Sequence, residues 1–386
     1  MKLYRSLSFL CKPVTLASRA FVRANTQPRF LRQTDSKATF SNQGTIKTPA
    51  LSCSLAAGSS CQRSTHIHDT QRTSCFSTGS HLSQSSSSNT FGQPVIHSVF
   101  EDRTGTWQYV VADPTTLSAA IIDPVLNFDP TTRIITSESA DLLLSLVKDH
   151  GYEVNRILET HIHADHLTAA SYIQNSLARE QAQRPQICIG KRIEQLQKMF
   201  GRRYDIPAQE YQGAFDHLLD DDEIFTIGNM NAQAVHLPGH TPDHLGYKIG
   251  DNIFCGDSIF HADIGTARCD FPGGDAASLY QSGRKLLALP DHVKIWTGHD
   301  YPPPERSDPV PWLSVQEHRS RNKHLMEGST ETVFVALRHD RDTKLAEPKL
   351  LHQSLQMNVR AGRLPEISQM GQRMLHLPLK LHCPAW

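Results

Sequence analysis

The chain has 386 residues, of which 38% are apolar and 20% charged, which is enough for one large domain or two ordinary domains with a hydrophobic core. Lysine plus arginine and aspartate plus glutamate both number 39, so net charge gives no reason to expect a nucleic acid or an anionic membrane as partner. The sequence lacks the roughly 18 consecutive apolar residues of a membrane-spanning helix, and its eight cysteines form no Cys-x-x-Cys pair, which fits a reducing compartment.

The N-terminal segment, residues 1–34, is basic. It contains seven lysine and arginine residues, and the first acid is Asp35. Leu3, Leu7 and Leu10 have the spacing of an amphipathic helix among these bases. This composition is typical of a mitochondrial transit peptide and predicts import into the mitochondrial matrix. The alternative is that the protein is cytoplasmic and that this segment is a basic tail that is not a targeting signal.

Three further regions follow from composition. Residues 35–91 are rich in Ser, Thr, Gln and Gly and lack a sustained apolar period, so they cannot bury enough apolar surface to offset the entropy of ordering. We interpret them as a disordered linker. Residues 92–305 are expected to form the main domain, and residues 306–386 a helical extension packed on it.

The main domain opens with three short strands separated by turn residues, at 95–100, 107–112 and 118–122. Apolar spacing predicts a helix over 140–150, and a further strand is expected over 154–160. The remaining pattern consists, in chain order, of a helix at 169–180, a strand at 186–189, a helix at 192–200, strands at 223–227, 232–237, 245–249 and 253–255, a helix at 275–289 and a strand at 293–297. Runs of strands with helices between and after them favour two sheets sandwiched between helices.

The densest group of possible metal ligands is the sequence Thr-His-Ile-His-Ala-Asp-His at 160–166. If this segment is extended, alternation of side chains points His161 and His163 the same way. Asp165 and His166 follow where the strand pattern stops, which suits a loop that presents further ligands. The alternative is a polar turn with hydrogen-bonded histidines.

Three more candidate ligands, His240, Asp257 and His299, each follow an expected strand and a glycine. Glycine permits the turns and the close backbone approach that a crowded centre requires. Imidazole nitrogen and carboxylate oxygen together suit zinc or iron, whereas calcium favours oxygen alone. Asp257 also ends an apolar strand, where an unpaired carboxylate would be costly.

These motifs, in this order, resemble the metallo-β-lactamase superfamily over about residues 95–301. The resemblance implies an α/β protein with the αββα sandwich fold. Carried over by matching motif, the two metal sites of a hydrolase would use His161, His163 and His240 for one, Asp165, His166 and His299 for the other, and Asp257 as a bridge.

A narrower resemblance is to the persulfide dioxygenases, a branch related to glyoxalase II. Its Thr-His-x-His-Ala-Asp-His motif matches at Ala164, and its Gly-x-x-Arg-x-Asp-Phe segment matches residues 265–271. The resemblance implies one Fe²⁺ per chain, held by His161, His240 and Asp257, with the other four ligands as supporting groups or a second metal site. Two histidines and one carboxylate leave positions open for dioxygen and substrate. The implied reaction oxidises glutathione persulfide or a related persulfide to sulfite with O₂.

Four residues are assigned to catalysis: Asp257, Arg268, Asp300 and Tyr301. Arg268 is expected to meet a substrate carboxylate, and the alternative is a structural salt bridge with Asp270 or Asp300. The expected partners are a small thiol or persulfide and O₂, with no nucleic acid and no membrane, and a homodimer is left open.

The chain departs from compact members of this branch in a basic segment at 190–205 and in the extension beyond Tyr301, which includes residues 354–362. Both resemble longer bacterial β-lactamase-like relatives. The basic segment is interpreted as a solvated helix face, the alternative being a rim that attracts an anionic thiol.

The main functional alternative is a dinuclear zinc hydrolase of the glyoxalase II type, with two Zn²⁺ per chain, because all seven hydrolase-type ligands are present. Ala164 and the lack of a matching glutathione-binding domain argue against it. A non-catalytic metal-binding protein is the third reading. Cys255 and Cys269 are interpreted as packing residues. The remaining histidines are interpreted as surface or satisfied core residues, namely His217, His236, His244, His261 and His292.

Overall fold

The structure, a computed structural model, describes residues 92–381. The expected transit peptide at 1–34 and linker at 35–91 lie outside the described residues, as does 382–386.

The first sheet has six strands in the order β1-β2-β3-β6-β8-β9. Strands β1 to β3 form an antiparallel meander, whereas β3, β6, β8 and β9 run parallel. Their bounds are β1 (Val95–Glu101), β2 (Thr106–Ala112), β3 (Ser118–Ile122), β6 (Glu153–Leu158), β8 (Gln186–Gly190) and β9 (His217–Leu219).

The second sheet also has six strands, in the order β10-β11-β12-β13-β14-β15. All neighbours are antiparallel except β13 and β14. Their bounds are β10 (Ile224–Ile227), β11 (Met230–His236), β12 (Leu245–Ile249), β13 (Asn252–Phe254), β14 (Lys294–Trp296) and β15 (Trp312–Ser314). A small third sheet consists of β4 (Val125–Asp129), β5 (Ile134–Thr136) and β7 (Leu167–Thr168).

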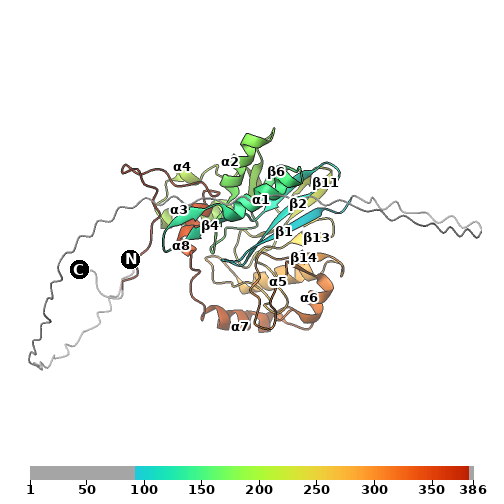
Figure 1. Cartoon of the computed structure of the whole chain (residues 1–386). Helices are drawn as coiled ribbons and strands as arrows, with labels where there is room; N and C mark the ends of the chain where they lie inside the picture. Colours follow the sequence, from blue (N-terminus) through green and yellow to red (C-terminus); the bar gives the residue numbers. More distant parts are fainter. Residues whose placement is uncertain (1–91, 382–386) are drawn as a thin grey trace, which may run out of the picture. The chain divides into compact units, whose positions relative to one another are not determined.

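Helices cover the outer face of each large sheet (Figure 1). The first sheet is covered by α1 (Glu138–Asp149), α2 (Ala170–Glu180), α3 (Ile193–Arg203), α4 (Ala208–Tyr211) and α8 (Leu351–Asn358). The second is covered by α5 (Ala276–Leu287), α6 (Val315–Arg321) and α7 (Glu331–Asp342). None of the helices in the described residues is both long and apolar enough to cross a membrane.

Strand alternation explains the layers. In β2, Val110 and Ala112 belong to the apolar cluster under the first helical layer, whereas Tyr109 and Val111 belong to the cluster between the sheets. Successive side chains of a strand face opposite sides, so a strand buried on both faces must be apolar throughout. Three stacked apolar clusters separate four layers, which confirms the αββα sandwich of the metallo-β-lactamase fold.

The strand expected over 154–160 is shorter than predicted. Strand β6 ends at Leu158, and 159–166 forms an irregular loop. The argument that strand alternation orients His161 and His163 was therefore wrong, because both lie in this loop. The sequence also did not predict the short strands β4, β5, β7, β9 and β15.

Residues beyond 305 contribute more than helices. Strand β15 pairs with β14 and forms an edge of the second sheet, while α8 packs on β7. The described residues, 92–381, belong to one compact unit. The residues that follow the main domain therefore contact the second sheet through β15. Through α8 they contact β7, the short strand that directly follows the loop with the histidine motif.

Candidate metal centre

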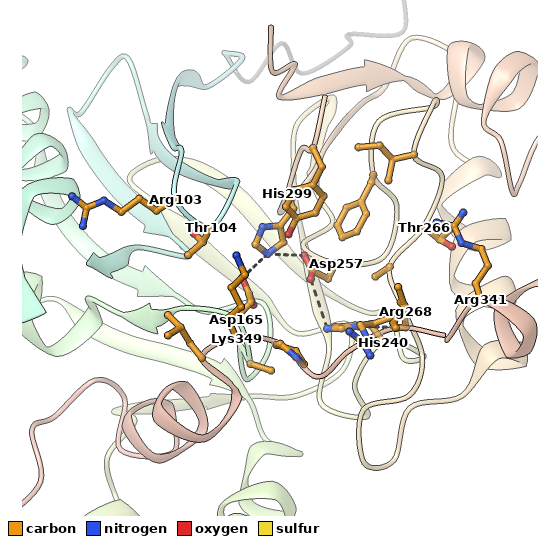
Figure 2. Close-up of a pocket in the computed structure, with 18 of the residues that line it drawn as sticks. Arg103, Thr104, Asp165, His240, Asp257, Thr266, Arg268, His299, Arg341 and Lys349 are labelled. Atoms are coloured by element: carbon orange, nitrogen blue, oxygen red, sulfur yellow. Dashed lines mark hydrogen bonds and ion pairs between the residues drawn. The ribbon is translucent and has the colours of Figure 1, made fainter. Parts of the chain in front are cut away.

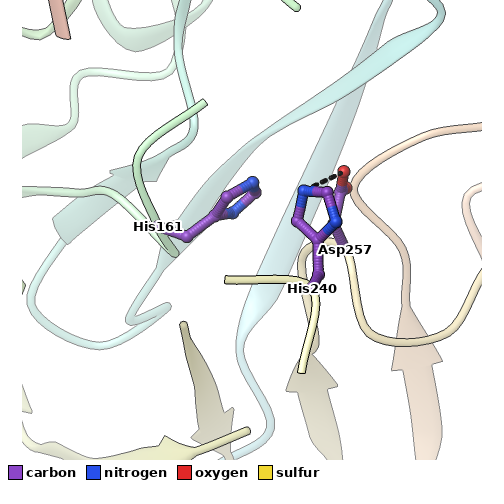
Figure 3. Close-up of side chains that lie close together, drawn as sticks. All are labelled: His161, His240 and Asp257. Atoms are coloured by element: carbon purple, nitrogen blue, oxygen red, sulfur yellow. Dashed lines mark ion pairs between the residues drawn. The ribbon is translucent and has the colours of Figure 1, made fainter. Parts of the chain in front are cut away.

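Three of the expected ligands converge. One ligand atom from each of His161, His240 and Asp257 lies within 4.8 Å of the others, and all three side chains are buried. Figure 3 shows the three side chains facing one another, and Nε2 of His240 lies 3.6 Å from Oδ2 of Asp257. His161 follows β6, His240 follows β11 and Asp257 follows β13. Three strand ends from both sheets therefore meet at one point.

Glycine makes this approach possible at two positions. Gly239 has φ of 140°, and a Cβ there would lie 2.3 Å from Cα of Leu279. Gly256 has φ of 46°, and a Cβ there would lie 2.5 Å from Oγ1 of Thr160. Both residues stand directly before a candidate ligand, so a side chain at either position would displace it.

The ring of His161 is oriented by a chain of hydrogen bonds. The Thr160 hydroxyl donates to Oδ2 of Asp123 at 2.8 Å, so its oxygen accepts from Nδ1 of His161 at 2.9 Å. Nε2 of His161 is then unprotonated, and it has no hydrogen-bond partner among the described residues. Burial, and then the neighbouring histidines, hold the pKa of His161 well below its usual value. A buried neutral imidazole with a free lone pair is suited to bind a metal ion.

In His240, as in His161, one ring nitrogen is hydrogen-bonded and the other faces the centre. Nδ1 of His240 donates to the carbonyl oxygen of Arg268 at 2.7 Å, which leaves Nε2 to face Asp257. Oδ1 of Asp257 is buried and, within residues 92–381, has no hydrogen-bond partner. Buried polar atoms without partners are rare in folded proteins. The donor set of two imidazoles and one carboxylate therefore fits a divalent transition metal.

A second group lies beside the first. Ligand atoms of His163, Asp165 and His166 lie within 4.8 Å of one another. Nε2 of His299 lies 3.2 Å from Oδ2 of Asp165 and 3.6 Å from Oδ1 of Asp257. Although burial opposes it, His299 and His166 lower the pKa of Asp165, so this carboxyl is ionised. Asp257 thus turns one oxygen to each group, the position that a bridging ligand needs.

The ring of His163, a member of the second group, lies beside a ligand of the first: its centroid is 4.2 Å from the centroid of His161 and 4.2 Å from that of His166. Its Nε2 contacts Oδ1 of Asp123 at 3.2 Å and Oε2 of Glu159 at 3.3 Å. Its Nδ1 is buried and has no partner in the described part of the chain. His163 therefore offers the opposite ring nitrogen from the other histidines.

Part of this centre lines a cavity of about 850 Å³. Asp165, His240, Asp257 and His299 line it at the centre, and Figure 2 shows them grouped there. Cations also line the cavity, namely Arg103, Arg268, Arg338, Arg341 and Lys349. Its apolar lining includes Phe260, Ile264 and Leu350.

Arg268 lines the cavity and also makes a salt bridge. Its Nε and Nη2 each donate to a carboxylate oxygen of Asp270 at 2.5 Å, and its Nη1 donates to the carbonyl oxygen of Ala346 at 2.8 Å. A structural salt bridge with Asp270 was the alternative that the sequence left open for Arg268. Three of its five N–H donors are used, so two remain for a ligand.

Asp300 and Tyr301 differ in their placement. Asp300 is buried, forms a two-point ion pair with Arg306 at 2.5 and 2.6 Å, and accepts from the backbone N–H of Val310. It lies outside the cavity lining, so its expected catalytic role is not supported by its position. Tyr301 lines the cavity, is half exposed, and stacks on the ring of His299 with centroids 5.6 Å apart.

Sequence reasoning did not assign two supporting residues of this centre. Asp123 accepts from the Thr160 backbone and hydroxyl and contacts His163. His244 stacks on His161 with centroids 4.7 Å apart. His244 lies four positions after His240 in the same turn, which is a signal that could have been used.

No residue of the basic segment at 190–205 lines the cavity. Lys191 pairs with Asp220, and Arg192 pairs with Asp221. The interpretation as a solvated helix face fits this arrangement. Burial raises the pKa of Cys255 and of Cys269 to about 12, which fits their interpretation as packing residues.

The four-layer fold and the two groups of histidine and aspartate define a metal-binding enzyme of the metallo-β-lactamase type. Residues 102–299 match the Metallo-beta-lactamase superfamily, and the chain belongs to it. Its enzymes bind metals and act on small molecules.

Among relatives, the chain is 42% identical over 296 residues to the beta-lactamase hydrolase-like protein of Xylella fastidiosa, covering 76% of this chain and 67% of that protein. It is 27% identical over 288 residues to the mitochondrial persulfide dioxygenase of Mus musculus, covering 74% of this chain and 94% of that protein. The crystal structure of ETHE1 from Myxococcus xanthus aligns with a TM-score of 0.55 and 24% identity, covering 70% of this chain and all of that one. The last similarity concerns the fold.

Proposed function

We propose that the protein is a persulfide dioxygenase that holds one Fe²⁺ on His161, His240 and Asp257. The observation that carries this proposal is the convergence of these three buried side chains, of which His240 and Asp257 line the cavity. Iron bound there would supply the binding and four-electron reduction of dioxygen that oxidation of the persulfide sulfur requires. Dioxygen and one water together supply the three oxygens of sulfite, and the thiol leaves.

The substrate is proposed to be glutathione persulfide or a related anionic persulfide. Arg341 and Lys349 lie at the cavity and have no carboxylate partner among residues 92–381; Arg341 contacts Nε2 of His324 at 3.2 Å. Arg268 also lines the cavity and adds two N–H donors that have no partner among the described residues. Exposed cations around a concave site attract an anionic substrate and can bind its carboxylates.

A dinuclear zinc hydrolase of the glyoxalase II type is the second candidate. It is favoured by the second group of ligands, in which Nε2 of His166 has no partner within residues 92–381, and by Asp257, which faces both groups. In the dioxygenase, His163, Asp165, His166 and His299 instead orient the iron ligands and bind water near them.

Metal analysis distinguishes these candidates. Protein purified under reducing, low-oxygen conditions should contain one iron per chain and should not hydrolyse an acyl-glutathione thioester. Two zinc ions per chain together with thioesterase activity would support the hydrolase instead.

We also propose that the protein works in the mitochondrial matrix, on the composition of residues 1–34. A fusion of these residues to a fluorescent protein should be imported into mitochondria and shortened. A diffuse cytoplasmic signal would contradict the proposal.

A further inference from the structure

The loop that carries the histidine motif is held by one side chain from the far end of the chain. Nδ2 of Asn358 donates to the carbonyl oxygens of His163 and His166, both at 2.8 Å. Its Oδ1 accepts from the backbone N–H of Thr168 at 2.9 Å. Asn358 is only 3% exposed, and 195 positions separate it from His163. Three of its four hydrogen-bonding positions are therefore used on residues 163–168, which are the end of this loop and strand β7.

The loop needs such a partner because it lies outside the sheets. Residues 159–166 follow the end of β6 and make no strand ladder. A buried carbonyl without a partner costs about 1–3 kcal/mol. Asn358 binds the carbonyl oxygens of His163 and His166. Among the described residues, Nδ1 of His163 and Nε2 of His166 have no hydrogen-bond partner. Rotation of either peptide would turn these ring nitrogens away from the centre.

The end of α8 that carries Asn358 is itself fixed from several directions. Nε2 of Gln197 donates to the carbonyl oxygen of Val359 at 2.9 Å, and Nε of Arg360 pairs with Glu210 at 2.8 Å. Gly362 has φ of 77°, and a Cβ there would lie 2.5 Å from the carbonyl oxygen of Thr168. Helices α3 and α4 thus hold the segment at a fixed distance from the loop.

We infer that Asn358 is a positioning residue of the metal centre, through which α8 sets the orientation of His163 and His166. An asparagine is suited to this role because its amide donates twice and accepts once, whereas aspartate of the same shape cannot donate when ionised. Partners behind the ligands typically change metal affinity by about 10–100-fold when removed. The inference rests on Zn²⁺ binding by the group of His163, Asp165 and His166 and does not depend on the persulfide reaction.

The experiment compares Asn358→Asp and Asn358→Ala with a control on the same helix. Gln356 is 2% exposed and exchanges two hydrogen bonds of 2.8 Å with the backbone of His376, away from the histidine loop. Gln356→Ala therefore removes a buried amide of similar importance for folding. Zn²⁺ affinity of each metal-free protein is measured by competition with a chelator, and urea unfolding of the same samples gives stability.

Both Asn358 variants should bind Zn²⁺ about 10–100-fold more weakly, while Gln356→Ala binds it as wild type does despite a comparable loss of stability. Wild-type affinity in Asn358→Asp, or an equal loss of affinity in Gln356→Ala, would overturn the inference. If Asn358→Ala does not fold, Asn358→Ser is measured in its place. A loss of affinity in protein that lacks dioxygenase activity would support the inference and count only against the proposed function.

Discussion

Nε2 of His244 accepts a hydrogen bond of 2.9 Å from the backbone N–H of Asp257. Because the same imidazole stacks on His161, it contacts two of the three proposed iron ligands. His244 is fully buried, and burial, followed by the charges of nearby histidines, holds its pKa well below the usual value. A neutral ring is required, since only an unprotonated Nε2 can accept this bond.

Replacement of His244 by Phe should weaken metal binding by about tenfold. The phenyl ring keeps the stacking surface but leaves the Asp257 N–H without an acceptor. Metal affinity is measured by chelator competition, with His236→Phe as the control, because His236 is half-buried and outside the cavity lining. Equal affinity in the two variants would contradict the assigned role.

Asp257→Asn and Arg268→Ala should separate metal binding from substrate binding. Asp257→Asn keeps the shape but removes the charge, so metal content and oxygen uptake should fall together by at least about tenfold. Arg268→Ala should raise KM about tenfold, or ~1.4 kcal/mol, with metal content near wild type, because the backbone carbonyl that orients His240 remains. Loss of metal from Arg268→Ala would show that its side chain supports the centre.

Lys349→Ala and Arg341→Ala should each raise KM for glutathione persulfide about threefold to tenfold while leaving kcat unchanged. The effect should diminish with added salt, because exposed charges are screened. Lys380→Ala is the matched control, since this exposed lysine pairs with Glu347 and lies outside the cavity lining. Initial rates at two salt concentrations test the prediction, and an equal effect of Lys380→Ala would argue against it.

His324 should make stability depend on pH. Its Nδ1 accepts from the Thr266 backbone N–H at 3.1 Å. Burial, together with Arg338, Arg341 and Lys323, lowers its pKa to about 4 from 6.5, and Asp342 opposes this shift. Between pH 4 and pH 6.5, His324 is therefore protonated in the unfolded chain but not in the folded protein. The free energy of unfolding then falls by about 1.4 kcal/mol for each unit by which the pH decreases from 6.5 to 4.

His324→Gln removes this titration. Between pH 7 and pH 5 the variant should lose about 2 kcal/mol less stability than wild type, as measured by urea unfolding at both values. An identical loss in the two proteins would show that His324 does not contribute in this range.

The apolar pattern predicted two sheets between helices, and the motifs placed His161, His240 and Asp257 among seven candidate ligands, because both are local properties of the sequence. Only the resemblance to the persulfide dioxygenases separated these three from the other four. The sequence could not predict the role of Asn358, because its partners His166 and His163 lie 192 and 195 residues earlier in the chain. Nor could it place Asp300, since a carboxylate after a motif can face either the cavity or Arg306, and only side-chain direction decides. The irregular loop after Leu158 was missed because its backbone is held by Asp123, Asp243 and Asn358.

The central claim is tested most directly by the stoichiometry of the reaction. Iron-loaded protein is mixed with glutathione persulfide in an oxygen electrode chamber, and sulfite is measured in the same sample, with Asp257→Asn as the inactive reference. We predict one O₂ consumed and one sulfite formed for each persulfide, by protein that contains one iron per chain. No oxygen uptake by the iron-loaded protein, together with thioester hydrolysis by protein that contains two zinc ions, would contradict the account.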